Sequence, residues 1–445
     1  MTRLFPPTRL RFLPLVLAIG WGAGAQAQSL LDLYQSARGY DATYQSAKAQ
    51  FDATFAKADQ AKALLLPKAS LGLSSSRTNL ESSSSSPPTD RVYGTQTATL
   101  SASQPLYRPA DWAAYQQGIK GGEAAGAALK AAEQDLIVRL SQAYFDVLAS
   151  SDSLQFVKAQ KTAVQEQLAS AKRNFEVGTA TITDTREAQA RYDLVLAQEI
   201  AADNDLRVKN LALTQLVGGT EVKPKSVAAP VVLNAASPDD VNVWVSQSQV
   251  ENQGLLQLQV ALEVAKLETK KAQAGHLPTL DLVGKYTATD NNGSATSTAN
   301  SGSNTTTIGL ALNLPIFAGF STQNRIRETV ALEAKARTDL EGSQRTVAQA
   351  TRAAFYGVQS GLGQVKALEA AEVSSQSALD ANKLGYQVGV RINIDVLNSQ
   401  SQLFDTKAKL AKARYDVLVG GLKLRQASGS LKVEDLEQVN ALLAK

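Results

Sequence analysis

Phe175-Glu176-Val177-Gly178 decides the fold, because the chain repeats it 211 residues later as Tyr386-Gln387-Val388-Gly389. A repeat of this length is too long for one unit of a solenoid. We therefore expect a duplicated half, placed around an axis. Other segments recur at the same offset: Leu66-Pro67 as Leu277-Pro278, Gly218 as Gly429, and Ile182-Thr183-Asp184 as Ile394-Asp395, in register on the aspartate.

Residues 1–27 have the features of a secretory signal peptide. Arginines precede an apolar stretch over residues 13–25, and Ala25-Gln26-Ala27 fits an A-x-A cleavage site. The mature chain of an exported protein is then expected to begin near Gln28. The alternative is an uncleaved membrane anchor, for which the apolar stretch is short.

The composition excludes several kinds of protein. The chain has no cysteine, hence no disulfide framework and no cysteine for a lipid anchor. Without the three arginines of the signal peptide, 42 basic residues face 41 acidic ones, which gives no reason to expect nucleic acid. His276 is the single histidine, and no phosphate loop or nucleophile motif stands out. We expect no enzyme activity, catalytic residue, metal site or cofactor.

Long helices dominate the expected fold. Residues 111–176 contain no proline, and apolar or small residues recur about every 3.5 positions, the period of a coiled coil. At about 1.5 Å per residue, such a helix is roughly 100 Å long. Residues 322–386 match it in the second copy. Gly178 and Gly389 are expected to end these helices as C′ glycines.

Each long helix is expected to turn back into a shorter one. Asp184, with Glu187 three residues later, fits a helix N-cap and its capping-box partner. Asp395 occupies the equivalent position in the second copy. The returning helices should run to about Val217 and Ser428.

Two further helices, over residues 29–66 and 237–275, precede the strands. The second should start at Ser237-Pro238-Asp239-Asp240, which offers a cap, a proline at the first position and acids near the dipole. The resulting plan is a signal peptide (1–27), repeat 1 (28–219, with two strands at about 68–107), a linker (220–237), repeat 2 (238–430, with two strands at about 278–317) and a C-terminal segment (431–445).

Two segments in each copy follow a period of two. Leu310 and Leu312 alternate with polar or small residues, as do Leu71 and Leu73, which is typical of a half-buried strand. Segments of about 10 to 14 residues also suit a tilted membrane-spanning strand with polar loops on the outer side. The alternative is a pair of soluble β-hairpins that cap a helical bundle.

Aromatic residues at the strand–helix junctions favour the membrane. Tyr107, Phe317 and Phe320 stand where an interfacial belt would lie. Four strands cannot close alone, and lipid tolerates no open edge, so several chains must share one barrel. Two chains give eight strands filled by side chains, whereas three give twelve and a lumen. We expect a mixed α and β fold, mainly α: a homotrimer with a coiled-coil α-helical barrel and a 12-stranded transmembrane β-barrel.

The chain resembles the TolC family of outer-membrane efflux and type I secretion proteins in Gly275-His276-Leu277-Pro278-Thr279-Leu280-Asp281-Leu282 and in both glycine turns. The resemblance covers essentially all of the mature chain. It implies a passive exit duct in the cell outer membrane, with its helical barrel in the periplasm. Its partners would be a periplasmic adaptor (membrane fusion) protein and an inner-membrane pump of RND, ABC or MFS type. The alternative is a soluble periplasmic coiled-coil scaffold or adaptor, which needs no membrane-facing strands.

The resemblance also implies a gate near the helix turns. A gate that must open suits a few charge-assisted hydrogen bonds near water better than an apolar seam. From spacing alone, the aspartates concerned could instead be simple helix caps. The implied gate links join Asp184 to Tyr386 and Arg391, Thr183 to Arg391, and Gln167 to Lys383, where the family pattern has an acid.

A pore constriction and an adaptor contact complete the implied sites. Asp395 would ring the axis in three copies and favour cations. Asn398 stands where the family pattern has a second aspartate, so cation selectivity should be weaker here. The turns that would meet the adaptor are Val177-Gly178-Thr179 and Val388-Gly389-Val390, whose glycines also serve as helix terminators.

Overall fold

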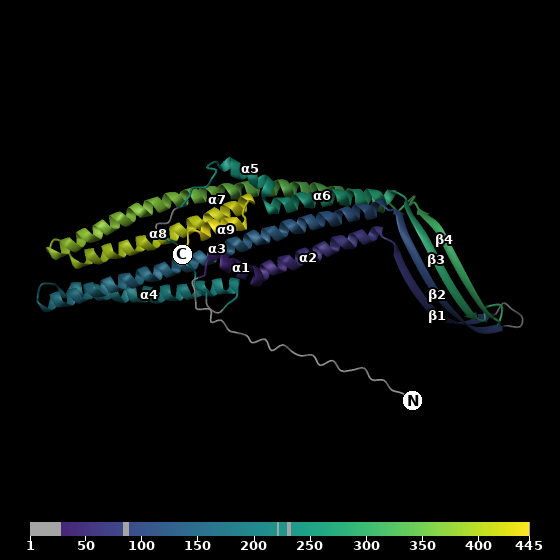
Figure 1. Ribbon diagram of the computed structural model, residues 1–445, viewed down its shortest axis with the longest axis horizontal. Helices are drawn as coiled ribbons and strands as arrows, with labels where there is room; N and C mark the ends of the chain where they lie inside the picture. The colour runs from purple at the N-terminus through teal and green to yellow at the C-terminus, as the bar shows by residue number, and fades with distance from the viewer. Residues whose placement is uncertain (1–27, 83–88, 220–221, 229–232, 445) are drawn as a thin grey trace, which may run out of the picture.

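The computed structural model describes residues 28–82, 89–219, 222–228 and 233–444; the expected signal peptide over 1–27 lies outside them. Helices form one long curved layer, and a four-stranded sheet continues it at one end (Figure 1). In the described part, no helix is both long and apolar enough to cross a membrane.

The two halves contain the same succession of elements. Helices α1 (Leu30–Tyr40), α2 (Ala42–Lys62) and α4 (Ile182–Val217) recur 211 residues later as α5 (Val241–Glu251), α6 (Gln253–Gln273) and α8 (Asn393–Ser428). The long helices are α3 (Pro109–Glu176) and α7 (Ser321–Gln387), with 68 and 67 residues. Short 3-10 turns, η1 (Ala63–Leu65) and η2 (Ala274–His276), lead into the sheet, and α9 (Val433–Asn440) ends the chain.

Both long helices end as the sequence predicts. Gly178 and Gly389 each have φ of 77°, in the left-handed region that glycine adopts without strain. The amide of Thr179 donates to the carbonyl of Asn174 at 2.8 Å, and Val390 donates to Gly385 at 2.8 Å. These 6→1 bonds, with the 5→2 bonds from the glycines, are Schellman motifs that satisfy the last carbonyls.

The predicted starts of the returning helices were wrong by one turn. Thr181 is the N-cap of α4, and Asp184 is the N3 residue of its capping box, with the two side chains 2.7 Å apart. In the second copy Ile392 precedes α8 without a side-chain cap, and Asp395 lies at N3. Since Thr181 and Asp184 both fit the capping-box pattern, spacing could not decide which residue caps.

The helices before the strands are each broken once, which the sequence reading missed. Asp41 separates α1 from α2 and caps α2 by accepting from the amide of Tyr44 at 2.8 Å. Asn252 does the same between α5 and α6 for the amide of Leu255 at 3.2 Å. The expected cap Ser237 is also corrected: α5 begins at Val241, with Asp240 as its N-cap.

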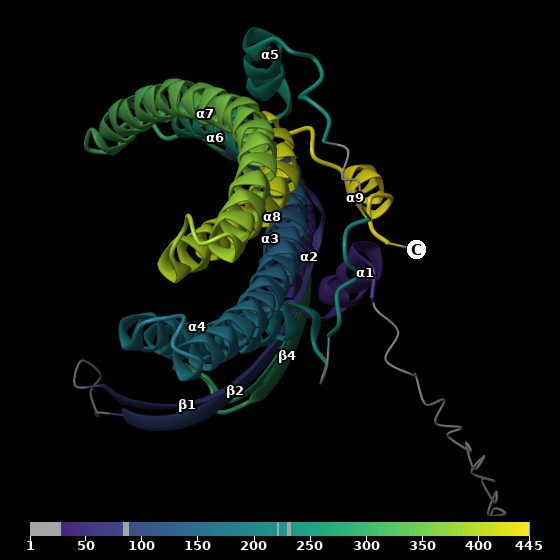
Figure 2. The same ribbon diagram turned by 90° about the vertical axis from the view of Figure 1, so that its left-hand side faces the viewer.

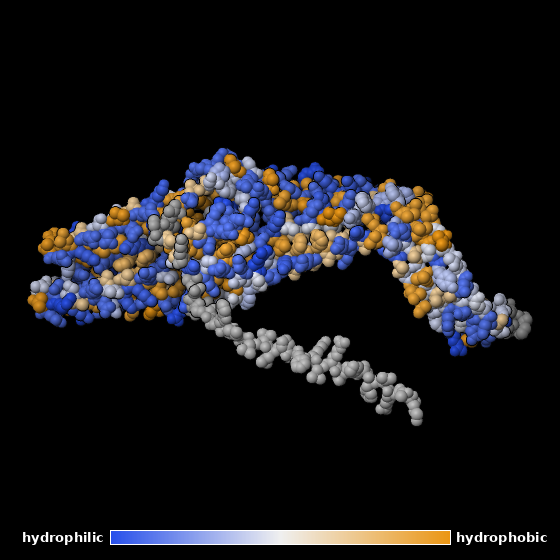
Figure 3. Space-filling model, viewed as in Figure 1, coloured by the Kyte–Doolittle hydropathy of each residue, from blue (hydrophilic) through white to orange (hydrophobic). Residues whose placement is uncertain are grey.

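The sheet comprises β1 (Lys68–Ser82), β2 (Thr89–Tyr107), β3 (Thr279–Asn292) and β4 (Asn300–Asn313), all antiparallel in that order. Leu71, Leu100 and Tyr286 share one register row and one face. The other face carries mostly small and polar residues, with Leu80, Tyr93 and Val283 as exceptions, so the predicted alternation is confirmed over most of the sheet. Figure 3 shows hydrophobic residues gathered over the part of the sheet nearest the helices, with hydrophilic ones at its far end.

The largest apolar core lies beside the helical layer, on its convex side (Figure 2). There α1, α9 and the described part of the linker pack on α3 and α8. The hydroxyl of Tyr144 donates to the carbonyl of Lys225 at 2.8 Å, which ties the linker to α3. Arg139 of α3 binds Asp41 through two hydrogen bonds, of 2.9 and 3.1 Å. These bonds hold the pKa of Asp41 below its ordinary value.

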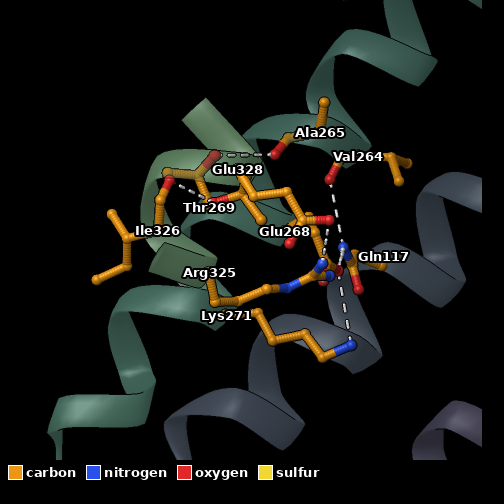
Figure 4. A network of polar contacts seen from close by, with 10 residues as sticks. Gln117, Val264, Ala265, Glu268, Thr269, Lys271, Arg325, Ile326 and Glu328 are labelled. Atoms are coloured by element: carbon orange, nitrogen blue, oxygen red, sulfur yellow. Dashed lines mark hydrogen bonds and ion pairs between the residues drawn. The ribbon is translucent and has the colours of Figure 1, made fainter. Parts of the chain in front are cut away.

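Just below the sheet, a polar network joins three neighbouring helices (Figure 4). Gln117 of α3 donates to Glu268 of α6 at 2.8 Å, and Arg325 of α7 binds the same carboxylate at 2.6 Å. Lys271 lies 3.6 Å from it. The hydrogen bond from Gln117, followed by the one from Arg325, lowers the pKa of Glu268. The network fixes the helices where they enter the sheet.

Candidate functional site

Most of the candidate site residues lie at the end of the molecule opposite the sheet. Here α3 and α4 form a first hairpin, and α7 and α8 form a second (Figure 1). Leu397 of α8 is fully buried in a core with Val164 and Leu168 of α3. Leu379, Val396 and Leu403 fill the second hairpin. The apolar seam between α3 and α8 therefore holds the hairpins side by side.

A buried amide bridges the two hairpins. Asn393, the first residue of α8, is only 1% exposed. It accepts a hydrogen bond from Gln167 of α3 and donates to the backbone carbonyl of Asp184 in α4 at 3.5 Å. One side chain of the second hairpin thus contacts both helices of the first.

Three more hydrogen bonds join α8 or α7 to the first hairpin. Asn174 donates to the hydroxyl of Tyr386 at 3.3 Å, next to the turns. Arg191 donates to Asn398 at 2.6 Å. The last bond, from Gln160 to Ser401, is 3.1 Å long. All three bonds run from the first hairpin to the second, so any outward movement of the second hairpin must break them.

Farther from the turns, a half-buried acid joins α3 to α8. The hydroxyl of Tyr415 donates to Asp152 at 2.6 Å. Burial raises the pKa of Asp152, and burial together with the hydrogen bond to Asp152 raises the pKa of Tyr415. This contact joins α3 and α8 at a distance from the turns.

The single chain does not bring the predicted gate pairs together. Within the described residues, Asp184 binds Thr181, and Arg391, in the turn before α8, lies 3.7 Å from Asp395 in the first turn of α8. Thr183 and Lys383 are exposed. Links from Asp184 to Tyr386 or Arg391, from Thr183 to Arg391, and from Gln167 to Lys383 therefore stay predictions, for contacts between chains.

The turns and the junction aromatics are both solvent-exposed in one chain. Val177, Val388 and Val390 are 72%, 66% and 79% exposed. Gly178, Thr179 and Gly389 are exposed beside them. At the other end, Tyr107, Phe317 and Phe320 are 48%, 72% and 62% exposed. Exposed apolar groups at both ends indicate contact with something outside the chain.

Sequence reasoning missed Asn174, Arg191 and Asn393. Asn393 lies in a run of polar and apolar residues with no motif of its own, and its partner Gln167 is 226 residues away. Arg191 follows Asp184 by two helical turns, which was the one available signal. Among the residues described, no cluster of three or more histidine, cysteine or acidic side chains could hold a metal ion.

The comparisons with known proteins agree with this geometry. The profile of a family described as "Outer membrane efflux protein" matches residues 33–219 and 244–430. The two matched segments are displaced by the same 211 residues as the helices.

Curated relatives and solved structures match along nearly the whole chain. "Outer membrane protein TolC" of Vibrio cholerae is 33% identical over 435 residues, covering 97% of this chain and 98% of the relative. "Alkaline protease secretion protein AprF" of Pseudomonas aeruginosa is 30% identical over 428 residues, covering 94% and 88%. The CmeC outer membrane channel of Campylobacter jejuni, at 16% identity, aligns with a TM-score of 0.79 over 100% of this chain and 98% of its own.

Proposed function

Because the chain belongs to the outer membrane efflux protein family, we propose that it is the outer-membrane exit duct of an efflux or type I secretion system. It is a channel and not an enzyme, and its helical barrel lies in the periplasm. It forms trimers and works with an adaptor and an inner-membrane pump. The observation that carries this function is the sheet with one apolar face, joined to helices of 68 and 67 residues.

Fractionation tests this function. The protein is expected in the outer membrane, as a trimer whose migration on gels changes on heating. A monomer in the soluble periplasmic fraction would support the scaffold or adaptor alternative and contradict the duct.

The pump class is a finer proposal, and RND, ABC and MFS pumps all remain candidates. A relative named for alkaline protease secretion and a family described as an efflux protein support secretion and efflux alike. We infer that the adaptor meets the exposed turns at Val177 and Val388. Crosslinking from a cysteine introduced as Gly178→Cys, followed by identification of the captured adaptor, would assign the pump.

We propose that opening separates the second hairpin from the first. The closed state is supported by hydrogen bonds from Gln167, Asn174 and Arg191 within each chain. Links between chains, from Asp184 to Tyr386 and Arg391 of a neighbouring protomer, would add to them. Binding of the adaptor at the turns would offset these few bonds and open the duct, whose transport energy comes from the pump.

Removal of the links between chains is expected to open the duct partly. Asp184→Ala and Arg391→Ser should each raise the mean single-channel conductance in planar bilayers about two-fold, since each removes a charge-assisted bond of roughly 1–2 kcal/mol. Arg186→Ala, an exposed arginine on the same turn of α4, is the control. Unchanged conductance in both variants would mean that these residues do not hold the gate.

The constriction proposal predicts how polyvalent cations block the channel. Asp395→Ala should weaken block, because it removes three carboxylates from the ring. Asn398→Asp should strengthen block only modestly, because Arg191 lies 2.6 Å from that side chain and would neutralise the new charge. Asn398→Asp combined with Arg191→Gln should strengthen it by about tenfold. Titration of block with a trivalent cation measures each case; equal block in all variants would place the constriction elsewhere.

A further inference from the structure

A hollow of about 480 Å³ lies between α3 and α6, just below the sheet. Its apolar part is Ile119 and Leu267, and Ile119 is 43% exposed. Lys120 is paired with Glu263 at 2.9 Å, whereas Lys266 and Lys270 have no acidic partner among the described residues. An apolar floor with two free ammonium groups is not explained by packing within the chain.

The hollow faces outward. Ile119 lies 25 residues before Tyr144, about seven helical turns, so both point to the same side of α3. The hydroxyl of Tyr144 binds the linker at Lys225, and Tyr144 belongs to the core that contains α1 and α9, which lie on the convex side of the layer (Figure 2). Trp112, two turns before Ile119, belongs to this outer face and is 53% exposed.

Lys62 adds a third free ammonium group to the same face. It lies five turns after Tyr44, whose hydroxyl accepts from Arg38 of α1 on the convex side at 3.3 Å. Like Lys266 and Lys270, Lys62 is exposed, and it has no acidic partner in the part of the chain that is described. The last turns of α2 and α6 therefore present unpaired positive charge to the periplasm.

A neighbouring protomer leaves this face open. The helices below the sheet run in the order α2, α3, α6 and α7, each in contact with the next. Neighbours in a ring therefore meet α2 and α7, whereas the hollow lies between the two central helices.

Trp112 and Lys270 lie within reach of the inner surface expected for the membrane. Trp112 follows the aromatic Tyr107 by five residues, and Lys270 precedes the first residue of β3 by nine, or about 14 Å at the helical rise. The polar layer of a bilayer is roughly 5–8 Å thick on each side, and charges act over a Debye length of about 8 Å. Long lysine side chains also extend toward headgroups.

We propose that the outer face of Trp112, Ile119, Lys62, Lys266 and Lys270 binds an anionic phospholipid from the periplasmic leaflet of the outer membrane. The phosphate would lie among the ammonium groups beside Ile119, and the glycerol and first acyl carbons would lie on Trp112, which is nearer the sheet. The sheet, with its apolar face, follows directly on these helices along the chain, so a lipid that lines the sheet would reach the surface without leaving the leaflet. The inference rests on the outer-membrane location within the proposed function.

Native mass spectrometry of the detergent-solubilised trimer tests the proposal with phosphatidylglycerol and phosphatidylethanolamine as probes. The trimer should retain up to three phosphatidylglycerol molecules in preference to phosphatidylethanolamine. The variant Lys62→Gln/Lys266→Gln/Lys270→Gln should retain about tenfold less, since each lysine near an anionic surface contributes appreciably. Lys158→Gln/Lys172→Gln/Lys366→Gln removes the same charge far from the sheet and should behave as the parent.

Three results would overturn the site. They are equal retention of both lipids by the parent, equal loss in the two triple variants, or displacement of lipid by millimolar glycerol 3-phosphate, which would indicate a site for a soluble phosphate ester. As a second measurement, brominated phosphatidylglycerol should quench Trp112 more than brominated phosphatidylethanolamine in a Trp244→Phe background, since Trp21 belongs to the expected signal peptide. Conductance of the same samples separates the two hypotheses: normal channels without lipid preference contradict only this inference, and absent channels contradict the duct.

Discussion

Asn393→Ala is expected to raise the mean single-channel conductance of the trimer severalfold. The substitution removes a side chain of α8 that hydrogen-bonds to both helices of the first hairpin. Two lost hydrogen bonds, and a Gln167 amide left without its partner, cost the closed state about 2 kcal/mol. A shift of that size changes a two-state ratio by roughly 30-fold, and three copies act on one pore.

The matched control is Asn382→Ala. The Asn382 amide donates to Ser399 at 2.5 Å, so it makes the same kind of bond between α7 and α8, within the second hairpin. If opening is a movement of one hairpin against the other, this variant keeps the parent conductance. Equal conductance of both variants would show instead that opening loosens each hairpin internally.

Arg139→Ala is expected to destabilise the protein by about 2 kcal/mol, which lowers the thermal midpoint of the trimer in detergent by several degrees. The Asp41 carboxylate, 6% exposed as a residue, would lose both hydrogen bonds from the guanidinium and stay buried with its charge. Arg38→Ala, which removes a more exposed arginine 3.5 Å from Glu133, should change the midpoint little.

The second half of the chain suggests a second substitution that should restore the stability of the Arg139→Ala variant. Asn252 and Ala350 stand 211 residues after Asp41 and Arg139, so the equivalent helix break is capped there by a neutral amide. Asp41→Asn/Arg139→Ala should therefore recover most of the loss, because asparagine caps helices as well as aspartate does. No recovery would mean that Arg139 acts through Asp135, its other partner at 2.6 Å, and not through Asp41.

Acid dependence gives a separate readout of the same pair. Because Arg139 lowers the pKa of Asp41 in the folded state, the pair stabilises the protein above the unfolded pKa of about 4. That contribution is lost as the pH falls through the folded pKa. The stability difference between the parent and Arg139→Ala should thus be largest near neutral pH and shrink below about pH 4.

Periodic features of the sequence predicted the fold well. The spacing of apolar residues located α3 and α7, and Gly178 and Gly389 located their ends, because these signals are local and repeated. The alternation over β3 and β4 predicted the faces of the sheet correctly. Helix starts were predicted less accurately. Two capping patterns overlap before α4, and the N-cap was assigned to Asp184, one turn after the observed N-cap Thr181.

The break at Asp41 and the contacts between hairpins needed the structure. A single residue with ψ of 116° interrupts α1 and α2 without changing the apolar period on either side, so no window average detects it. The bond from Gln167 to Asn393 depends on the relative shift of α3 and α8, which side-chain packing sets and spacing does not encode. The family resemblance predicted the region in which the site lies, but not which residues form these hydrogen bonds.

The two open edges of the sheet constrain how this protein is made. In the described chain β1 pairs only with β2, and β4 only with β3, so both outer strands carry unpaired backbone groups. Each such group costs several kcal/mol in hydrocarbon, so a lone chain cannot insert, and assembly must precede or accompany insertion. Three chains are then inserted into the membrane together or not at all. If a variant chain with a proline in β1 is co-expressed in equal amount with the parent chain, only about one trimer in eight contains no variant chain. The amount of inserted trimer should therefore fall well below half.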